Sequence, residues 1–507
     1  MQEISHKRRT FMARTAALVG AQAIGGALPV QALAAESDIA SLSAVEAVSA
    51  MRAGDLKSET YAQALLERCA ALKGLNVFLS QDREVVLESA RNADRARANG
   101  KRLGAMHGLP VPVKDSINTR SLPTTSGTPA LRNFRPAKDA PVARSLFDAG
   151  AILLGKTNLH ELSFGWTTNN LAYGPTRNPY DTNRIPGGSS GGTAVAIATS
   201  MAPVGLAEDT CGSIRVPAAF CGIKGFRPST FRWSTAGVMP LTSVFDTVGP
   251  HARSVGDLAL VDSVVTGDMK AITAPSLKGI RLGVIRDYFY ADLDPEVERV
   301  TEDALRLLRS AGVVLVEGSI PGLVENWQVA TFPIFQHETR LAISEYLKDY
   351  DTGVTWEELL EKASDDIKQS FGLFVVEGGK FRSTKAVYEE SRRTHRPALQ
   401  NAFRRYFRES GVSAIVHPTV MVPPPRIGQE GDIEVSGKSI PFYVAMSRNI
   451  APGSTVGIPG LVLPAGSTTE GLPVGLEFDA PVGRDRDLLA LGLALETVLP
   501  RVAPPRI

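Results

Sequence analysis

Two serines in small-residue surroundings are the first candidates for chemistry in this 507-residue chain. Ser189 lies in the run GGSSGG at residues 187–192, and Ser213 lies in CGS at residues 211–213. Glycine adopts backbone conformations that other residues avoid and lets a ligand come close to the main chain. The segment between the two sites contains VAIATSMAPVGLA, which indicates buried chain rather than a polar linker. We therefore expect a serine nucleophile at one end of this segment.

The first serine site fits the pattern G-x-S-x-G, which marks a hydrolase nucleophile when a strand comes directly before it. Residues 178–186 (NPYDTNRIP) are a poor strand, so a tight turn into a helix over residues 193–200 is the structural alternative. His417 ends an apolar, strand-like run and could complete a Ser-His-Asp α/β-hydrolase with Ser189.

The second serine site follows an apolar, strand-like run at residues 202–207. Backbone N–H groups at such a strand-to-turn junction can converge on one oxygen, which is how an oxyanion hole is built. Asp209 and Arg215 flank the turn with opposite charges and could pair to fix it. Cys211 and Cys221 lie nearby, but a reactive cysteine needs a cation or a histidine to lower its pKa, and no histidine is near in sequence.

Lys114 ends another apolar run, in which Val111 and Val113 predict a short strand that leads into a turn. A lysine in this place could be a buried base. The alternative is a surface lysine paired with Asp115.

Strand and helix signals alternate along the chain and predict an α/β fold. Residues 278–285, a helix beginning at Asp294-Pro295 and residues 313–317 form a β-α-β unit with parallel strands. A helical, charge-rich section covers about residues 325–410. Further strands are expected at residues 75–79, 151–155, 414–417, 460–463 and 474–478, and a closing helix at residues 485–499.

Residues 1–34 have the layout of an export signal. A basic start with Arg8 and Arg9 precedes a short Ala/Gly-rich run, and Ala32-Leu33-Ala34 offers a cleavage site. The segment around Arg8-Arg9 resembles a twin-arginine signal, which implies a periplasmic protein. The alternative is an uncleaved anchor or an amphipathic arm. No later stretch has the roughly 18 uninterrupted apolar residues of a membrane-spanning helix, so no membrane association is expected of the mature chain.

The composition excludes several classes of partner. The net charge is +2 with 21% charged residues, which does not indicate a nucleic-acid footprint. The three cysteines form no pair with zinc-ligand spacing, so no metal site is expected.

The serine sites together resemble the amidase signature family. The family's core motifs are matched by GGSSGGTAVAIA and DTCGSIRVPAAFCGIKGFRPST, and its flanking motifs by PVPVKDSI, GKTNLHELSFG and IPGLVLPAG. The resemblance extends over residues 40–500. It implies one large α/β domain over residues 35–507, with a mixed central sheet covered by helices on both faces.

The resemblance also implies a Ser–cis-Ser–Lys triad that needs no cofactor. Carried onto this chain, Ser213 is the nucleophile, Ser189 the bridging serine and Lys114 the base. The implied oxyanion donors are backbone N–H groups, those of Thr210, Cys211, Gly212 and Ser213. The implied supporting residues are Ser190, Asp209 and Arg215. The family usually has Gly at the position of Cys211, so its side chain is expected to constrain φ or to narrow the acyl pocket.

The late segment IPGLVLPAGSTTEGLPVGLEFDAPVGRDRDLLALGLALE is similar to that of members acting on arylacetamides, such as mandelamide and indoleacetamide hydrolases. The implied substrate is therefore a small aromatic or aryl-acetic amide, cleaved to carboxylate plus ammonia or amine by a monomer or homodimer. Peptide C-terminal amides, anilides, esters and carbamates are the alternatives within the family. A further alternative is the amidase-like subunit of a tRNA-dependent transamidase, which the export signal argues against.

Overall fold

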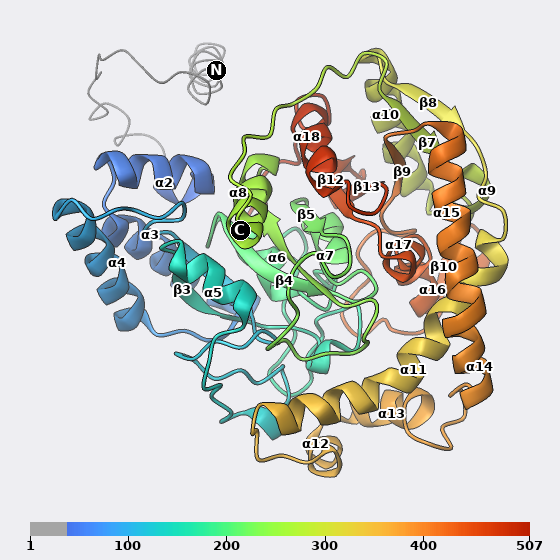
Figure 1. Cartoon of the computed structure of the whole chain (residues 1–507), viewed down its shortest axis with the longest axis horizontal. Coiled ribbons are helices and arrows are strands. Elements are labelled where there is room, and N and C mark those ends of the chain that lie inside the picture. The colour runs from blue at the N-terminus through green and yellow to red at the C-terminus, as the bar shows by residue number, and fades with distance from the viewer. Residues whose placement is uncertain (1–37) are drawn as a thin grey trace. The chain divides into compact units, whose positions relative to one another are not determined.

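The computed structural model describes residues 38–507 (Figure 1), and the predicted export signal lies outside the described residues. Its centre is an eleven-stranded sheet with the order β1-β3-β2-β4-β6-β5-β12-β13-β9-β7-β8. A separate two-stranded sheet contains β10 and β11. The strands are β1 (Phe78–Ser80), β2 (Pro110–Lys114), β3 (Ile152–Thr157), β4 (Val204–Asp209), β5 (Lys224–Arg227), β6 (Thr247–Ala252), β7 (Arg281–Val284), β8 (Val314–Glu317), β9 (Ala414–Pro418), β10 (Ile433–Val435), β11 (Lys438–Ile440), β12 (Gly460–Ser467) and β13 (Pro473–Asp479).

The large sheet is mixed. Parallel pairs join β2 to β3 and β4, and β7 to β8 and β9. Antiparallel pairs join β4 to β6, β6 to β5, β5 to β12, β12 to β13 and β13 to β9. Strands β2, β4, β6, β9 and β13 are buried at every position, as expected of strands that are covered on both faces.

Helices cover this sheet and extend beyond it. They are α2 (Ala44–Ala53), α3 (Ser58–Ala71), α4 (Arg83–Ala98), α5 (Pro141–Asp148), α6 (Gly191–Ala198), α7 (Arg215–Phe220), α8 (Val255–Thr266), α9 (Arg286–Phe289), α10 (Pro295–Ser310), α11 (Leu323–Asp349), α12 (Trp356–Lys362), α13 (Asp365–Phe374), α14 (Lys385–Glu390), α15 (Arg396–Ser410), α16 (Phe442–Ser447), α17 (Ala451–Val456) and α18 (Asp485–Leu495). Helix α6 contacts β2, β4 and β6, whereas α8 and α18 contact each other and the β5 and β12 region. Among the described residues, no helix has both the length and the apolar character needed to cross a bilayer.

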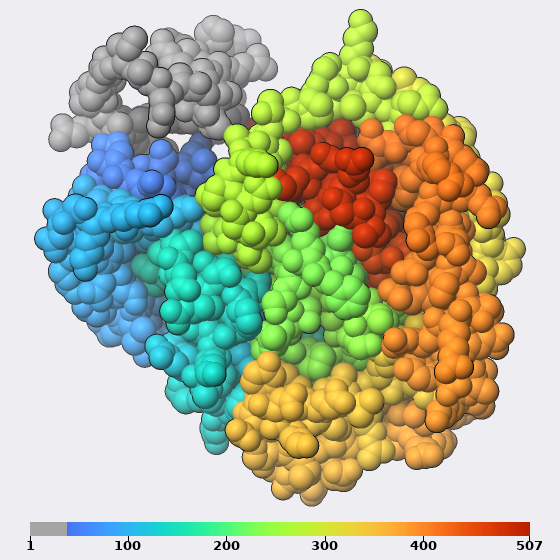
Figure 2. Space-filling view, viewed as in Figure 1, coloured from blue at the N-terminus to red at the C-terminus, as the bar shows by residue number. Residues whose placement is uncertain are grey.

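The predicted α/β architecture with a mixed sheet between helices is confirmed. The β-α-β unit is also confirmed, because β7 and β8 pair in parallel on either side of α10. The helical section is present as α11 to α15, and its gold and orange atoms form the lower and right-hand surface in Figure 2.

Several predicted strands have different bounds in the structure; the strand expected at residues 460–463, for example, continues to Ser467 as β12. Residues 73–75 form a short 3-10 helix, and β1 begins only at Phe78, because Asn76 adopts a left-handed conformation with φ 54°. The strand expected at residues 151–155 continues to Thr157 as β3 and therefore includes Lys156.

Candidate active site

Ser213 lies in the loop between β4 and α7, and Asp209 holds this loop in place. The Oδ1 atom of Asp209 accepts a hydrogen bond from the Gly212 N–H at 2.8 Å, and Oδ2 accepts one from the Ile214 N–H at 3.1 Å. Gly212 has φ 109°, and a Cβ atom there would lie 1.9 Å from Ile450 Cδ1. Only glycine fits this position without strain.

Asp209 is itself fixed by two buried arginines. Arg215 Nε lies 3.1 Å from Asp209 Oδ2, and Arg227 Nε lies 3.3 Å from Oδ1. Burial alone would raise the pKa of Asp209, but the two guanidinium groups outweigh it and hold this pKa well below its usual value. The expected pairing of Asp209 with Arg215 is therefore present.

The GGSSGG turn contacts the Ser213 loop directly. The Ser190 N–H donates to the Ser213 carbonyl at 3.3 Å, and Ser190 Oγ donates to the Glu208 carbonyl at 3.1 Å. The peptide bond between Gly188 and Ser189 is cis. The two serine sites of the sequence thus meet in one place, at the start of α6 and the end of β4.

Lys114 at the end of β2 completes this arrangement. Its Nζ donates to Ser189 Oγ at 2.6 Å and forms an ion pair with Glu208. The alternative of a surface lysine paired with Asp115 is wrong, because Lys114 is fully buried and Asp115 pairs with Lys156 at 3.5 Å. Neighbouring side chains at a strand end point to opposite sides, which separates Lys114 from Asp115.

Two opposing effects act on the pKa of Lys114. Burial lowers its pKa, while the carboxylate of Glu208 raises it, and the net result is a pKa below the usual lysine value. A lysine in this state gives up a proton more readily than a lysine in water.

Glu208 is the residue of this site that the sequence reasoning missed. Its side chain lies next to Lys114, yet the sequence prediction assigned it no role. The signal that could have found it is a charged residue at a position of β4 that is otherwise apolar and buried.

The family of the chain follows from comparisons with known proteins. The family described as Amidase matches residues 61–489. The chain belongs to the amidase family. An indoleacetamide hydrolase from Agrobacterium vitis is 37% identical over 457 residues, which cover 90% of this chain and 97% of that protein. A mandelamide hydrolase from Pseudomonas putida is 37% identical over 477 residues, 92% of each chain. A crystal structure of an amidase superposes with a TM-score of 0.80 at 30% identity and covers 90% of this chain and all of that one.

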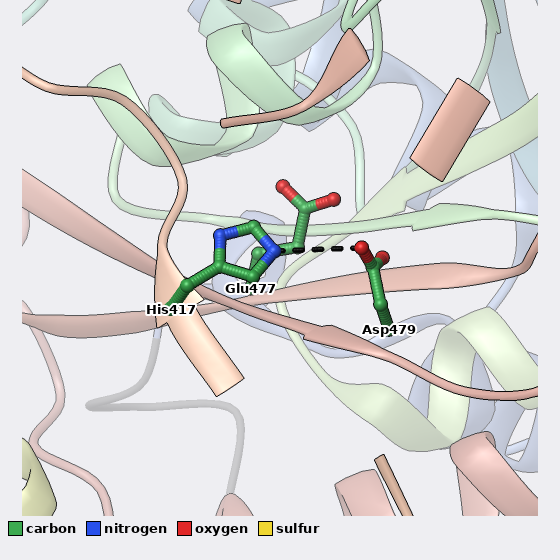
Figure 3. A group of neighbouring side chains, drawn as sticks. All are labelled: His417, Glu477 and Asp479. Atoms are coloured by element: carbon green, nitrogen blue, oxygen red, sulfur yellow. Dashed lines mark hydrogen bonds and ion pairs between the residues drawn. The ribbon is translucent and has the colours of Figure 1, made fainter. Parts of the chain in front are cut away.

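His417 of this amidase lies in a different cluster from Ser189. Its Nε2 is 3.4 Å from Asp479 Oδ2 (Figure 3). Its Nδ1 is 3.0 Å from the Pro418 carbonyl, and its ring stacks on Phe289. Ser189 contacts Lys114 instead. The structure therefore does not bring together the pair that a Ser-His-Asp hydrolase would require.

Glu477 lies beside His417 and Asp479 (Figure 3), and the three could offer ligand atoms within 4.8 Å of one another. However, Glu477 Oε1 already accepts a hydrogen bond from Arg215 Nη1 at 2.7 Å. In this amidase the group therefore supports Arg215, and through Arg215 the Ser213 loop.

Cys211 contributes its side chain to an apolar cluster beside Ser213. The cluster contains Cys211, Val244, Phe245 and Ile334, with Trp166 and Tyr388 packed against it. Trp166 Nε1 donates to the Cys211 carbonyl at 2.8 Å. Burial raises the pKa of the Cys211 thiol to about 12, so the thiol is a poor nucleophile in this amidase.

The expectations for Cys211 have a mixed outcome. The left-handed backbone of the loop falls on Gly212 and not on Cys211, so Cys211 puts no side chain at a strained φ. Its side chain lies in the apolar cluster, and the narrowing of the acyl pocket stays a prediction. Cys69 and Cys221 are buried as well.

Proposed function

We propose that this amidase hydrolyses small aryl-acetic amides to a carboxylate and ammonia through an acyl-enzyme on Ser213. The observation that carries the proposal is the contact of Lys114 with Ser189 next to the Ser213 loop. A serine hydroxyl is a weak nucleophile until a neighbouring base takes its proton. The indoleacetamide and mandelamide hydrolases among its relatives support an aromatic acyl group.

The proposed reaction begins with attack of Ser213 Oγ on the amide carbon. The proton of Ser213 passes to Ser189 Oγ, and Ser189 passes its own proton toward Lys114. The same path in reverse protonates the leaving nitrogen, so that ammonia departs and the acyl group stays on Ser213. Water then attacks the acyl-enzyme by the same proton path and releases the carboxylate.

Backbone N–H groups of the loop stabilise the oxyanion in this proposal. One of the four expected donors needs correction, because the Gly212 N–H already donates to Asp209 Oδ1. The donors that we propose for the oxyanion are therefore the N–H groups of Thr210, Cys211 and Ser213.

The apolar cluster around Cys211 is the proposed wall of the acyl pocket. Phe245 and Ile334 are fully buried and form its base, whereas Trp166, which packs against the cluster, is half-buried and offers the flat, apolar contact that an aromatic ring prefers. A charged or strongly polar acyl group would lose its hydration beside these side chains without gaining a partner.

A panel of amides tests the substrate class. Ammonia release is measured for indole-3-acetamide, mandelamide, hexanamide and a C-terminally amidated dipeptide, with Ser213→Ala as the blank. We expect the highest kcat/KM for the two aromatic amides. A preference for hexanamide or the peptide amide would contradict the proposed acyl pocket.

We also propose that residues 1–34 direct export to the periplasm. The Arg8-Arg9 pair, the Ala/Gly-rich run and the small residues at Ala32 and Ala34 support it. Expression in a bacterium with a twin-arginine system, followed by N-terminal sequencing of periplasmic protein, should give a start near Ala35. Protein that stays in the cytoplasm and begins at Met1 would contradict it.

A further inference from the structure

Glu208 places a second proton-binding group directly behind the lysine of the site. It forms an ion pair with Lys114 Nζ, the same atom that donates to Ser189 Oγ. Lys114 has no exposed side-chain area and Glu208 has only 5%. Ser189, Lys114 and Glu208 therefore form a continuous chain of hydrogen bonds that leads away from Ser213.

We propose that Glu208 is the terminal proton acceptor of this chain, and that Lys114, an ammonium group before and after the step, gives one proton to Glu208 as it takes one from Ser189. The inference rests on the proposed function, because it concerns the proton that Ser213 loses. Glu208 acts through Lys114 and touches no reacting atom, so it is a positioning residue for the proton path.

The proton balance is simple. Ser213 Oγ bonds to the amide carbon and gives its proton to Ser189 Oγ, and Ser189 gives its proton to Lys114 Nζ. Lys114 can take this proton only because it gives one of its ammonium protons to Glu208 in the same step, so the Glu208 carboxylate becomes a carboxylic acid and Lys114 is an ammonium group again. Collapse of the tetrahedral intermediate returns the proton along the same chain to the leaving nitrogen.

The buried environment of the pair favours the proposed path over one in which a neutral Lys114 faces the Glu208 carboxylate before the reaction. A neutral Lys114 before the reaction would leave the buried Glu208 carboxylate without a partner, which is costly. In the proposed path the ion pair is complete before the reaction, and afterwards the Lys114 ammonium balances the negative charge that develops on the substrate oxygen.

Other titratable groups surround the pair and must be separated from it in the test. Asp209 is bound to Arg215 and Arg227. Asp246 accepts hydrogen bonds from Leu241 N and Thr210 Oγ1, and burial raises its pKa to about 7. Burial lowers the pKa of His160 and of His251 to about 4, so both are neutral at pH 7. Asp246 is thus the neighbour whose own titration has to be separated by a variant in the test.

The proposal and its rival predict opposite effects of Glu208→Gln on the pH profile. If Glu208 accepts the proton, its removal forces Lys114 to be neutral before the reaction, and the acidic limb of kcat/KM moves to higher pH. If Glu208 only stabilises a charged Lys114, its removal makes the lysine easier to deprotonate, and the limb moves to lower pH.

The test is the pH profile of kcat/KM for indole-3-acetamide in the full chain and in Glu208→Gln, Glu208→Asp and Asp246→Asn. In Glu208→Gln we expect the midpoint of the acidic limb to move to higher pH by at least about one pH unit. This shift lowers kcat/KM at pH 6 by about tenfold or more. Glu208→Asp keeps a carboxylate, so the midpoint of its acidic limb should stay at low pH. Asp246→Asn should have the same midpoint as the unaltered enzyme. The proposal would be overturned if the midpoint of the acidic limb moved to lower pH in Glu208→Gln, or if it moved only in Asp246→Asn.

The unaltered enzyme provides a second readout in case Glu208→Gln does not fold. Ionisation of a carboxylic acid has a small enthalpy, whereas deprotonation of an ammonium group absorbs much heat. The pH at the midpoint of the acidic limb should therefore stay nearly constant between 15 and 35 °C. A clear fall of this midpoint pH as the temperature rises would overturn the inference. If the unaltered enzyme cleaves none of the amides, the proposed function fails instead.

Discussion

Lys114 Nζ donates a hydrogen bond to Ser189 Oγ at 2.6 Å, although 75 positions separate the two residues. The lysine lies at the end of strand β2, and the serine lies in the turn before α6. The parallel pairing of Val113 with Leu206 sets β2 beside β4, which ends just before the Ser213 loop. One register in the sheet therefore brings three distant segments to a single site.

Replacing Lys114 with methionine should lower kcat/KM for an aryl amide by about 100- to 10,000-fold, because the path then lacks its proton-accepting nitrogen. Methionine fills a similar buried volume but leaves the buried Glu208 carboxylate without its partner, so Lys114→Met is also made together with Glu208→Gln. Steady-state ammonia release checks the loss, and the melting temperature shows that the variant is folded. Near-normal turnover at neutral pH would exclude Lys114 from the proton path.

The two neighbouring serines should respond differently to alanine. Ser189→Ala removes the bridge to Lys114 and should lower kcat by about 100-fold or more. Ser190→Ala loses only the hydrogen bond to the Glu208 carbonyl, which costs about 1 kcal/mol of stability. Single-turnover kinetics of both variants distinguishes the roles, and an equal loss in both would contradict the assignment of Ser189 as the bridge.

Arg215→Met should lower the free energy of unfolding by about 3–5 kcal/mol, because the buried Glu477 carboxylate loses its arginine and Asp209 loses one of its two. Arg144 forms an exposed pair with Asp148, so Arg144→Met is the matched control and should change stability little. Urea unfolding followed by circular dichroism checks both variants. Similar stability of the two would show that the network under the Ser213 loop does not support the fold.

His251 should make the protein less stable as the pH falls. Its Nε2 lies 2.7 Å from the Ile214 carbonyl, and burial lowers its pKa to about 4. The unfolded chain takes up a proton near the ordinary pKa of about 6.5, so stability from this group is complete above pH 6.5 and is lost as the pH falls toward 4. His251→Gln keeps a donor for the carbonyl and should flatten this loss in urea titrations between pH 7 and 4.5. An unchanged slope would remove His251 as its cause.

Much of the fold could be predicted because its strands are short apolar runs with clear breaks. The runs that became β4, β7, β8, β9, β12 and β13 carry this signal, and Pro295 at the start of α10 marks the helix between β7 and β8. The start of β1 was missed because it depends on the left-handed backbone of Asn76, which sequence periodicity does not reveal.

The site could be predicted only where motifs lie within one segment. The two serine motifs and Lys114 were found in this way, whereas the contact of Lys114 with Glu208 depends on how β2 aligns with β4. Sequence proximity pointed to Asp115 as the partner of Lys114, but in the fold Asp115 faces Lys156. The hydrogen bond from the Gly212 N–H to Asp209 could not be predicted either, because it depends on how the loop closes.

The most direct test of the central claim is to locate the residue that a fluorophosphonate modifies in the intact enzyme. No Lys or Arg lies between Arg184 and Arg215, so trypsin leaves Ser189 and Ser213 on one peptide, and cleavage after Glu208 separates them for mass spectrometry. The account predicts that the label is on Ser213, and that Ser189→Ala slows labelling without moving it. A label on Ser189 or Cys211 in the unaltered enzyme would contradict the account.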